Sequence, residues 1–253
     1  MTRTAVAPER EGDLIGLELA ELQAGQSFES PCERETVVVV LGGCVEVEVD
    51  GQSLGKAGGR RNVFEGPGHA VYAPPGSMLR LVATGAAQLA IATAPLGDGT
   101  PAEARIIRPQ DQRIDDVGKG NWARTVRLIL GPDQPAGRLI LGETINPPGN
   151  WASYPPHKHD RQAPPEEVRL AEVYFFKVDP PGGFGVQIRY DEGGNEAFIV
   201  RDGDVALIRS GYHPLVAAPG YSLYYLWIMA GEGRRMIPFV DPAHAWVQES
   251  SAV

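Results

Sequence analysis

Two histidines separated by one residue, His157 and His159, are the first candidates for chemistry in a chain that has 5 histidines among 253 residues. They follow Pro155 and Pro156 in the stretch GNWASYPPHKHD. Proline restricts φ and biases the preceding residue toward extended backbone. In an extended segment, side chains two residues apart point to the same side. The spacing therefore predicts that both imidazoles face one point, where they could hold one metal ion.

Two further residues could complete such a site. Glu172 begins the apolar stretch EVYFFKV, and His213 follows a glycine turn in RSGYHPL. Three neutral imidazoles and one carboxylate suit a borderline divalent ion such as Zn²⁺, Mn²⁺, Fe²⁺ or Ni²⁺. Glu166 and Glu167 compete with Glu172, but their stretch APPEEV is typical of a loop, so we favour Glu172, whose strand sets its direction. The alternative interpretation is three unrelated structural histidines.

The elements that must position these residues are predicted to be strands. Short stretches such as TVVVVLGG, CVEVEVDG, MLRLVATG and AQLAIATA form a first group, and RTVRLIL, EVYFFKV, GFGVQIRY, EAFIVRDG and LYYLWIMAG form a second. Many short strands and no long helix predict an all-β protein of two similar β-barrel or jelly-roll domains with little helix. The polar, Gly/Pro-rich connector LGDGTPAEARIIRPQDQ places the domains at residues 1–115 and 116–253.

The two halves resemble each other and indicate an internal duplication. In that alignment Arg34, Thr36 and Leu79 correspond to His159, Glu172 and His213. The first half then lacks the ligand types, and we expect it to be scaffold or an oligomer surface rather than a metal site.

Composition restricts the partners. Hydrophobic residues make up 43% and charged residues 22% of the chain, with a net charge of −9. An acidic chain without a basic block argues against nucleic acid or anionic membrane as a partner, and no apolar run approaches the roughly 20 residues of a membrane span. The N-terminal stretch MTRTAVAPEREGDL has no apolar core of a secretory signal, and there are only 2 cysteines. We expect a cytoplasmic protein, and leave a homo-oligomer open.

The motifs together resemble a known family. HKH, Glu172 and GYH on consecutive strands resemble the cupin superfamily. More narrowly, NWASYPPHKHD, EVYFFKVDPPGGFGVQIRY, EAFIVRDGDVALIRSGYHPLVAAPGYSLYYLWIMAG and DPAHAWV, with GGRRNVFEGPGHAVYAPPGS in the first half, resemble the 5-deoxy-glucuronate isomerases of bacterial myo-inositol catabolism. The sequence departs from this family at Ala171, where an acid is expected, and residues 160–171 are an insertion relative to the general cupin pattern.

The resemblance implies a bicupin fold, with one divalent ion and no organic cofactor. Zinc is the first choice of metal, with manganese, iron and nickel as alternatives. It also implies aldose–ketose isomerisation of a small sugar acid, 5-deoxy-D-glucuronate, to 2-deoxy-5-keto-D-gluconate through a metal-stabilised enediolate. Three alternatives stay open: the related ketol-isomerase acting on a deoxy-hexosulose uronate, an Fe(II) oxygenase, and a non-catalytic sugar-binding cupin.

Further residues could move protons or bind substrate. The candidates for proton transfer are Glu172, Lys158 and Tyr174. For the substrate carboxylate we favour Arg189 on an alternating strand, with Arg201 as its competitor, and we expect Gln187 on the same face by period 2. Tyr212 is a further substrate-binding candidate, and His244 could support the site from its periphery.

Overall fold

The computed structural model describes residues 1–7, 14–97 and 102–249. The predicted all-β class with little helix is confirmed: within those ranges the α-helix is limited to α1 (Trp246–Glu249), with 3₁₀ turns η1 (Val63–Glu65), η2 (Pro109–Asp111), η3 (Gly120–Trp122) and η4 (Glu232–Arg234). Residues 98–101 of the predicted connector lie outside the described residues. No helix in the described part of the chain is long and apolar enough to cross a membrane.

The chain divides into two compact units. The first comprises Met1–Arg113, Ile129–Leu141 and Glu232–Arg234, and the second comprises Ile114–Leu128, Gly142–Gly231 and Arg235–Val253. The long segment of the first unit thus ends close to the predicted boundary at residue 115. Two short later segments also belong to the first unit. A single boundary in the sequence therefore does not separate the two units.

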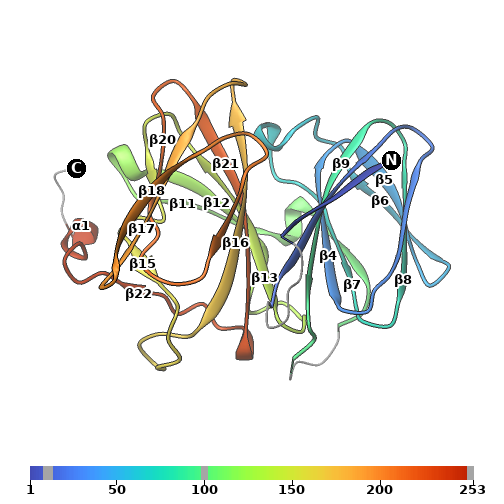
Figure 1. The fold of residues 1–253 in the computed structure, drawn as a ribbon. Coiled ribbons are helices and arrows are strands. Elements are labelled where there is room, and N and C mark those ends of the chain that lie inside the picture. Colours follow the sequence, from blue (N-terminus) through green and yellow to red (C-terminus); the bar gives the residue numbers. More distant parts are fainter. Residues whose placement is uncertain (8–13, 98–101, 250–253) are drawn as a thin grey trace. The chain divides into compact units, whose positions relative to one another are not determined.

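Two sheets form the first unit (Figure 1). A six-stranded sheet has the order β1 (Thr2–Ala7), β2 (Gly16–Leu22), β9 (Ala87–Ala94), β4 (Glu35–Gly42), β7 (Ala70–Ala73) and β10 (Arg105–Ile107). A four-stranded sheet has the order β3 (Ser27–Pro31), β8 (Met78–Ala83), β5 (Cys44–Val49) and β6 (Gln52–Gly58). In β5 the alternating VEVEV sequence buries its valines and leaves its glutamates at the surface or only partly buried, as period-2 patterning predicts.

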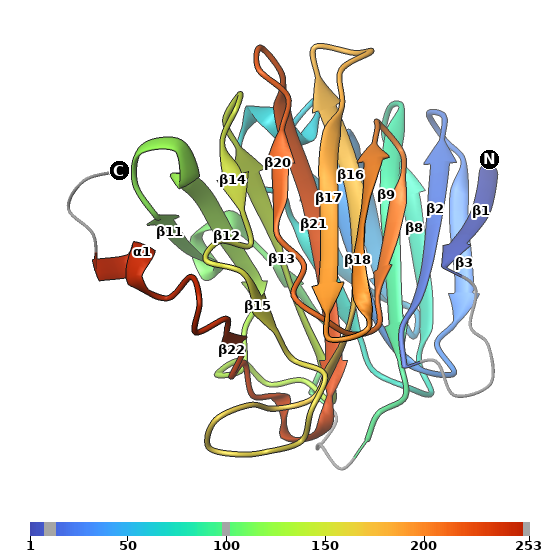
Figure 2. The same cartoon turned by 60° about the vertical axis from the view of Figure 1, so that its left-hand side comes forward.

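The sheets of the second unit follow the same plan (Figure 2). A six-stranded sheet has the order β11 (Arg113–Val117), β12 (Arg124–Leu130), β13 (Leu139–Asn146), β21 (Ser222–Gly231), β16 (Leu170–Asp179) and β19 (Val205–Ile208). A four-stranded sheet has the order β14 (Trp151–Ala152), β20 (Leu215–Ala217), β17 (Gly185–Asp191) and β18 (Gly194–Val200), and β15 (His157–Lys158) pairs with β22 (Phe239–Val240).

Strand order supports the internal duplication. The order β2-β9-β4-β7 matches β13-β21-β16-β19, and β3-β8-β5-β6 matches β14-β20-β17-β18. The register agrees as well: Thr36 of β4 pairs with Ala73, the last residue of β7, and Glu172 of β16 pairs with Ile208, the last residue of β19. Thr36 therefore occupies the place of Glu172, as the alignment of the halves predicts.

The counterpart of His213 follows a similar glycine turn in the first unit. Gly76 and Gly211 each lie three residues beyond the ends of β7 and β19, and both have positive φ, 89° and 82°. Counting from these glycines alone would match His213 with Met78, but Met78 is 49% exposed, whereas Leu79 and His213 are both 0% exposed. Burial therefore favours Leu79, the residue that the alignment of the halves predicts. Neither Met78 nor Leu79 is a metal ligand type of the kind found in the second unit.

Candidate metal centre

Separate elements of the second unit carry the predicted ligands. His157 lies in β15, whose partner β22 places Val240 opposite it, and His159 follows directly after this short strand. Glu172 lies in β16 between two neighbouring strands, opposite Met229 of β21 and Ile208 of β19. Pairing on both sides gives Glu172 a firmly set direction.

Three of the four predicted ligands converge. Nε2 of His159 lies 3.0 Å from Oε2 of Glu172, and Nε2 of His213 lies 3.3 Å from the same oxygen. Ligand atoms of these three residues lie within 4.8 Å of one another. The side chains are buried, with exposed fractions of 4%, 3% and 0% for His159, Glu172 and His213. Such a buried group of nitrogen and oxygen donors is of the type that binds a divalent ion.

His157 stands at the edge of this cluster. Its ring centroid is 5.0 Å from that of His213, and the residue is partly exposed. Burial of the ring lowers the pKa of His157 to about 3, with further lowering by His213 and His159. His157 is therefore a neutral imidazole at pH 7, the form that can bind a metal.

Each histidine has its Nδ1 atom against a backbone carbonyl. The distances are 2.9 Å from His159 to Leu170, 2.9 Å from His213 to Gly211, and 3.3 Å from His157 to Pro155. A carbonyl only accepts hydrogen bonds, so Nδ1 carries a proton, and in the neutral imidazole Nε2 is then the nitrogen able to bind a metal. Orientation of this kind is usual for histidines that bind metals.

The donor atoms of this cluster are better suited to binding a cation than to hydrogen bonding with one another. Nε2 of His213 is buried without a hydrogen-bond partner among the described residues, because its approach to Glu172 lacks hydrogen-bond geometry. Burial raises the pKa of Glu172, but the close approach of His159 and His213 outweighs that effect and lowers the pKa to about 2. An ionised carboxylate beside imidazole lone pairs is a suitable ligand set for a divalent ion.

A second layer of charged groups holds the ligands from behind. Asp160, directly after His159, accepts a hydrogen bond from the N–H of Gly211 at 2.8 Å, while the Gly211 carbonyl faces Nδ1 of His213. Lys158 donates to the other oxygen of Asp160 at 2.5 Å. The carboxylate of Glu167, which is 2% exposed, accepts the N–H of Asp160 at 2.7 Å and lies 3.4 Å from Lys158 Nζ. This network ties the His159 segment to the His213 turn.

The network also distinguishes Glu172 from the two acids that compete with it in the sequence. Glu167 is used within it, and Glu166 is exposed, so the structure brings Glu172 to the histidines. Lys158 alternates with His157 and His159 along the chain and is engaged by Asp160 and Glu167. Its ammonium group therefore lies on the side opposite the imidazoles.

Gly211 is required by this geometry. Its φ is 82°, in the left-handed region that favours glycine, and a Cβ there would lie 2.8 Å from the carbonyl oxygen of Tyr190. The turn can thus direct its N–H to Asp160 and its carbonyl to His213 at once.

Tyr174 lies on the same face of β16 as Glu172, two residues on. Its hydroxyl is 3.1 Å from the hydroxyl of Ser153, and its ring centroid is 6.2 Å from that of His213. Ser153 is buried with a φ of 48°, an uncommon conformation for a residue other than glycine. Burial and the charge of Glu172 raise the pKa of Tyr174 well above its ordinary value, so the phenol is protonated at neutral pH.

The predicted substrate-binding residues have different surroundings. Gln187 is fully buried and donates from Nε2 to the carbonyls of His213 at 2.8 Å and Pro214 at 3.1 Å. Its Oε1 has no hydrogen-bond partner among the described residues. Gln187 therefore stabilises the backbone at His213, one of the candidate ligands.

Arg189 and Tyr212 lie farther along the same region. Nε of Arg189 donates to Glu196 at 2.6 Å, and its Nη1 lies 3.5 Å from Ser210 Oγ. The ring of Tyr212 stacks on Tyr190 with centroids 5.1 Å apart. Arg189 already has a counter-ion, which a substrate carboxylate would have to displace.

Arg201 and His244 lie outside the cluster of candidate ligands. Arg201 is exposed, and its N–H donates to Asp204 in the turn before β19. His244 is partly buried within the C-terminal segment, where its N–H donates to the carbonyl of Asp241. Among the described residues, neither takes part in the three-residue cluster around Glu172.

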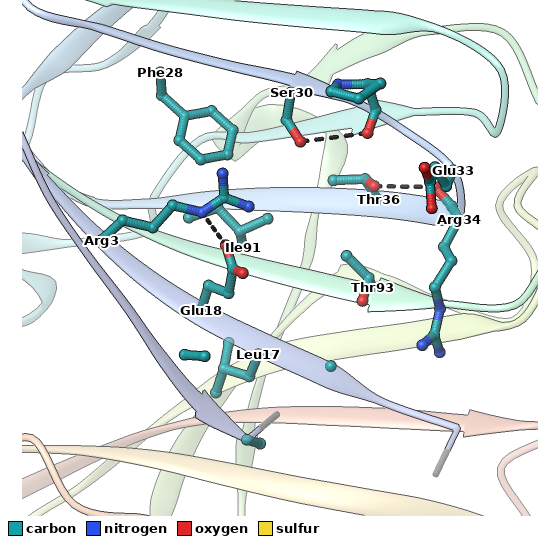
Figure 3. A pocket seen from close by; sticks show the side chains of 14 residues that line it. Arg3, Leu17, Glu18, Phe28, Ser30, Glu33, Arg34, Thr36, Ile91 and Thr93 are labelled. Atoms are coloured by element: carbon teal, nitrogen blue, oxygen red, sulfur yellow. Dashed lines mark hydrogen bonds and ion pairs between the residues drawn. The ribbon is translucent and has the colours of Figure 1, made fainter. Parts of the chain in front are cut away.

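The first unit has a hollow of about 450 Å³ at the Thr36 end of β4 (Figure 3). Arg3 pairs with Glu18 and lies 5.0 Å from the centroid of the Phe28 ring. Arg34 donates to the carbonyl of Leu14 at 2.7 Å. No histidine or cysteine is among the described residues that line this hollow, so it lacks the imidazole donors gathered in the second unit.

Comparison with known proteins gives consistent similarities. The model of the KduI/IolB family matches residues 2–247. The 5-deoxy-glucuronate isomerase of Geobacillus kaustophilus is 39% identical over 250 residues, covering 97% of this chain and 90% of that protein. The protein of the same name from Bacillus subtilis (strain 168) is 32% identical over 240 residues, covering 93% of this chain and 88% of that protein.

Solved structures show the same likeness. An IolB-like protein from Salmonella typhimurium LT2 superposes with a TM-score of 0.92 at 32% identity, covering 97% of this chain and 94% of that one. Bacillus subtilis oxalate decarboxylase superposes with a TM-score of 0.64 at 11% identity, covering 94% of this chain and 74% of that one. The second similarity concerns the fold alone, and it agrees with the expected two-barrel cupin-like architecture.

Proposed function

The chain belongs to the KduI/IolB family, and from that premise we propose that it is a metal-dependent aldose–ketose isomerase converting 5-deoxy-D-glucuronate into 2-deoxy-5-keto-D-gluconate. The names of the curated relatives support this substrate. The observation that carries the chemistry is the buried group of His159, Glu172 and His213, with both histidines held by backbone carbonyls so that Nε2 faces the carboxylate.

These three residues, with His157 as the fourth, would hold one divalent ion. Zinc is our first choice, and manganese, iron and nickel suit the same donors. When bound, such an ion polarises the substrate's carbonyl oxygen and stabilises the negative charge that develops as a proton leaves the neighbouring carbon. The reaction requires no redox cofactor, because the substrate is oxidised at one carbon and reduced at the next.

The chain's own groups then move the protons. Both histidines approach Oε2 of Glu172, so we assign Oε1 to carrying the proton between the adjacent carbons. Tyr174, protonated and on the same face, is assigned to donate its hydroxyl proton to a substrate oxygen. Lys158 lies between Asp160 and Glu167. We assign it an indirect role, in which it positions Asp160 and thereby helps to orient His213.

The proposed setting follows from the chain's chemistry. A net charge of −9 and two free cysteines support a cytoplasmic enzyme with a small sugar acid as its partner. Gln187 and Tyr212 are proposed to line the path of that substrate beside His213.

The test is an anaerobic assay of purified protein with its metal content measured in the same sample. Proton NMR should follow 5-deoxy-D-glucuronate turning into the keto acid, with chelation stopping turnover and a divalent ion restoring it. The deoxy-hexosulose uronate is assayed in parallel, and a preference for it would assign the related ketol-isomerase. Turnover only in the presence of oxygen would indicate an oxygenase, and uronate binding without turnover would indicate a binding protein. Full activity after exhaustive chelation would refute the metal-dependent mechanism.

A further inference from the structure

Arg124, the first residue of β12, lies on the same side of its sheet as the candidate metal ligands. Further along this strand, Arg127 directs Nη1 toward Glu143 at 3.6 Å. Glu143 also accepts a hydrogen bond from Tyr224 at 2.9 Å, so Arg127, Glu143 and Tyr224 share one side of the sheet. Arg124 is three positions from Arg127, and an odd spacing along a strand reverses the side.

The opposite side is the one that carries the catalytic candidates. Thr144, next to Glu143, accepts from Trp227 at 3.2 Å, and Tyr225 shares the Trp227 face of β21. The ring of Tyr225 lies 4.9 Å from that of Tyr174, which in turn shares the face of Glu172. Arg124 therefore belongs to the sheet face that runs from Tyr225 and Tyr174 to the histidine–glutamate cluster.

The surroundings of Arg124 are aromatic and neutral. Its Nη1 donates to the carbonyl of Trp122 at 3.1 Å, and the guanidinium lies 5.8 Å from the centroid of the Trp122 ring. Burial lowers the pKa of Arg124, and Tyr225 and Tyr174 act in the opposite direction. The group still carries its charge at neutral pH.

This cation lacks an acidic partner in the part of the chain that the structure describes: its contacts there are with the Trp122 carbonyl and ring and with Tyr225 and Tyr174, and none is with a carboxylate. A partly buried charge without a counter-ion is costly. The fork of N–H donors on a guanidinium matches a carboxylate in bidentate geometry. The site thus has an unused positive charge of the kind that recognises an acid.

We propose that Arg124 forms the carboxylate subsite of this centre, binding the acid group of a sugar acid whose aldehyde end lies at the histidine–glutamate cluster. In an open-chain uronate these two groups are at opposite ends of the carbon chain. Tyr174 stands between the two positions, with its ring near both Tyr225 and His213. The assignment rests on the proposed function for its substrate, and on the structure for its location.

The structure favours Arg124 over Arg189 for this task. Arg189 is already paired with Glu196 across β17 and β18 at 2.6 Å, so a substrate would have to separate an existing ion pair. At Arg124 the substrate would supply the missing charge. The two arginines therefore provide a matched comparison, in which the same substitution removes either a paired or an unpaired cation.

The experiment compares Arg124→Gln, Arg124→Lys and Arg189→Gln with the unaltered protein, all loaded with the same divalent ion. Calorimetry measures the affinity for D-glucuronate and for D-glucose, which differ at the acid group. We expect Arg124→Gln to weaken glucuronate binding about 10- to 100-fold, the range for a lost charge-assisted pair. Glucose binding, metal content and melting temperature should stay unchanged. Arg124→Lys should recover part of the loss, because it restores the charge without the fork.

Several results would overturn the proposal. These are glucuronate affinity unchanged in Arg124→Gln, the entire loss appearing in Arg189→Gln instead, or unaltered protein that does not prefer glucuronate over glucose. Should Arg124→Gln unfold, unaltered glucuronate affinity in Arg124→Lys would count equally against it. Absence of uronate isomerisation would refute the proposed function alone, since the binding comparison needs no turnover.

Discussion

Nε2 of His159 lies 3.0 Å from Oε2 of Glu172, although the residues are 13 apart in the sequence. The contact depends on the Leu170 carbonyl, which accepts from Nδ1 of His159 at 2.9 Å and belongs to the same strand as Glu172. One strand therefore supplies both a candidate ligand and the group that orients another candidate ligand. The predictions below test this centre and its supports.

Replacing any ligand with alanine should remove metal and activity together. The affinity for the divalent ion should fall by at least about 100-fold, because loss of a direct ligand should cost no less than loss of an outer partner. Metal analysis after dialysis against a weak chelator measures this in His157→Ala, His159→Ala, Glu172→Ala and His213→Ala. The control variants His69→Ala and His244→Ala should keep the metal. Retention of one equivalent of metal by the four ligand variants would contradict the assignment.

Tyr174→Phe should lower kcat by about 100-fold, a typical contribution of a positioned acid. Metal content should not change, because the substitution removes only the hydroxyl that lies 3.1 Å from Ser153. Steady-state kinetics with metal analysis of the same preparation checks this. An unaltered kcat would show that Tyr174 is a packing residue.

Asp160→Asn should weaken metal binding about 10- to 100-fold, the usual cost of losing an outer partner of a ligand. An amide can accept the Gly211 N–H through one oxygen, but its NH₂ group would then face Lys158, with which it cannot pair. Titration against a coloured competing chelator gives the affinity. Glu166→Gln, an exposed acid nearby, is the matched control. Equal metal affinities in the two variants would show that the network does not orient the candidate ligands.

Glu35→Ala should destabilise the first unit without affecting the metal. The buried carboxylate of Glu35 accepts the N–H groups of Gly137 at 2.5 Å, Arg138 at 2.7 Å and Leu139 at 2.9 Å. Leaving these donors unsatisfied should cost about 3 kcal/mol or more in the free energy of unfolding. Urea unfolding measures the loss. A change below about 1 kcal/mol would contradict this anchoring role.

His69 should make the protein less stable in mild acid. Burial lowers its pKa below 6.5, and Arg108 and Arg60 lower it further against a smaller opposing effect of Asp111. Below pH about 6.5 the unfolded chain then binds more protons than the native one, so stability falls as the pH decreases toward the native pKa. Urea unfolding from pH 8 to 5 should show a shallower loss for His69→Gln. The same pH dependence in both proteins would exclude His69 as the cause.

Local patterning was enough for the general character of this protein. Alternation in VEVEV and the many short apolar stretches indicate an all-β chain, since period 2 depends only on neighbouring residues. His157 and His159 likewise point to a metal through their spacing, and the long family motifs extend this to an isomerase. The equivalence of Thr36 and Glu172 could be predicted from the internal repeat.

Only the tertiary structure decided which charged side chains contact each other. Glu166, Glu167 and Glu172 are close in sequence, but β19 and β21 flank just the last of them, while Glu167 turns to Lys158. Arg189 carried the stronger sequence signal and is paired with Glu196, whereas Arg124 carried none. Pairing partners come from strands far apart in the chain, so their register, and with it the side to which each charge points, depends on long-range contacts that no local pattern contains.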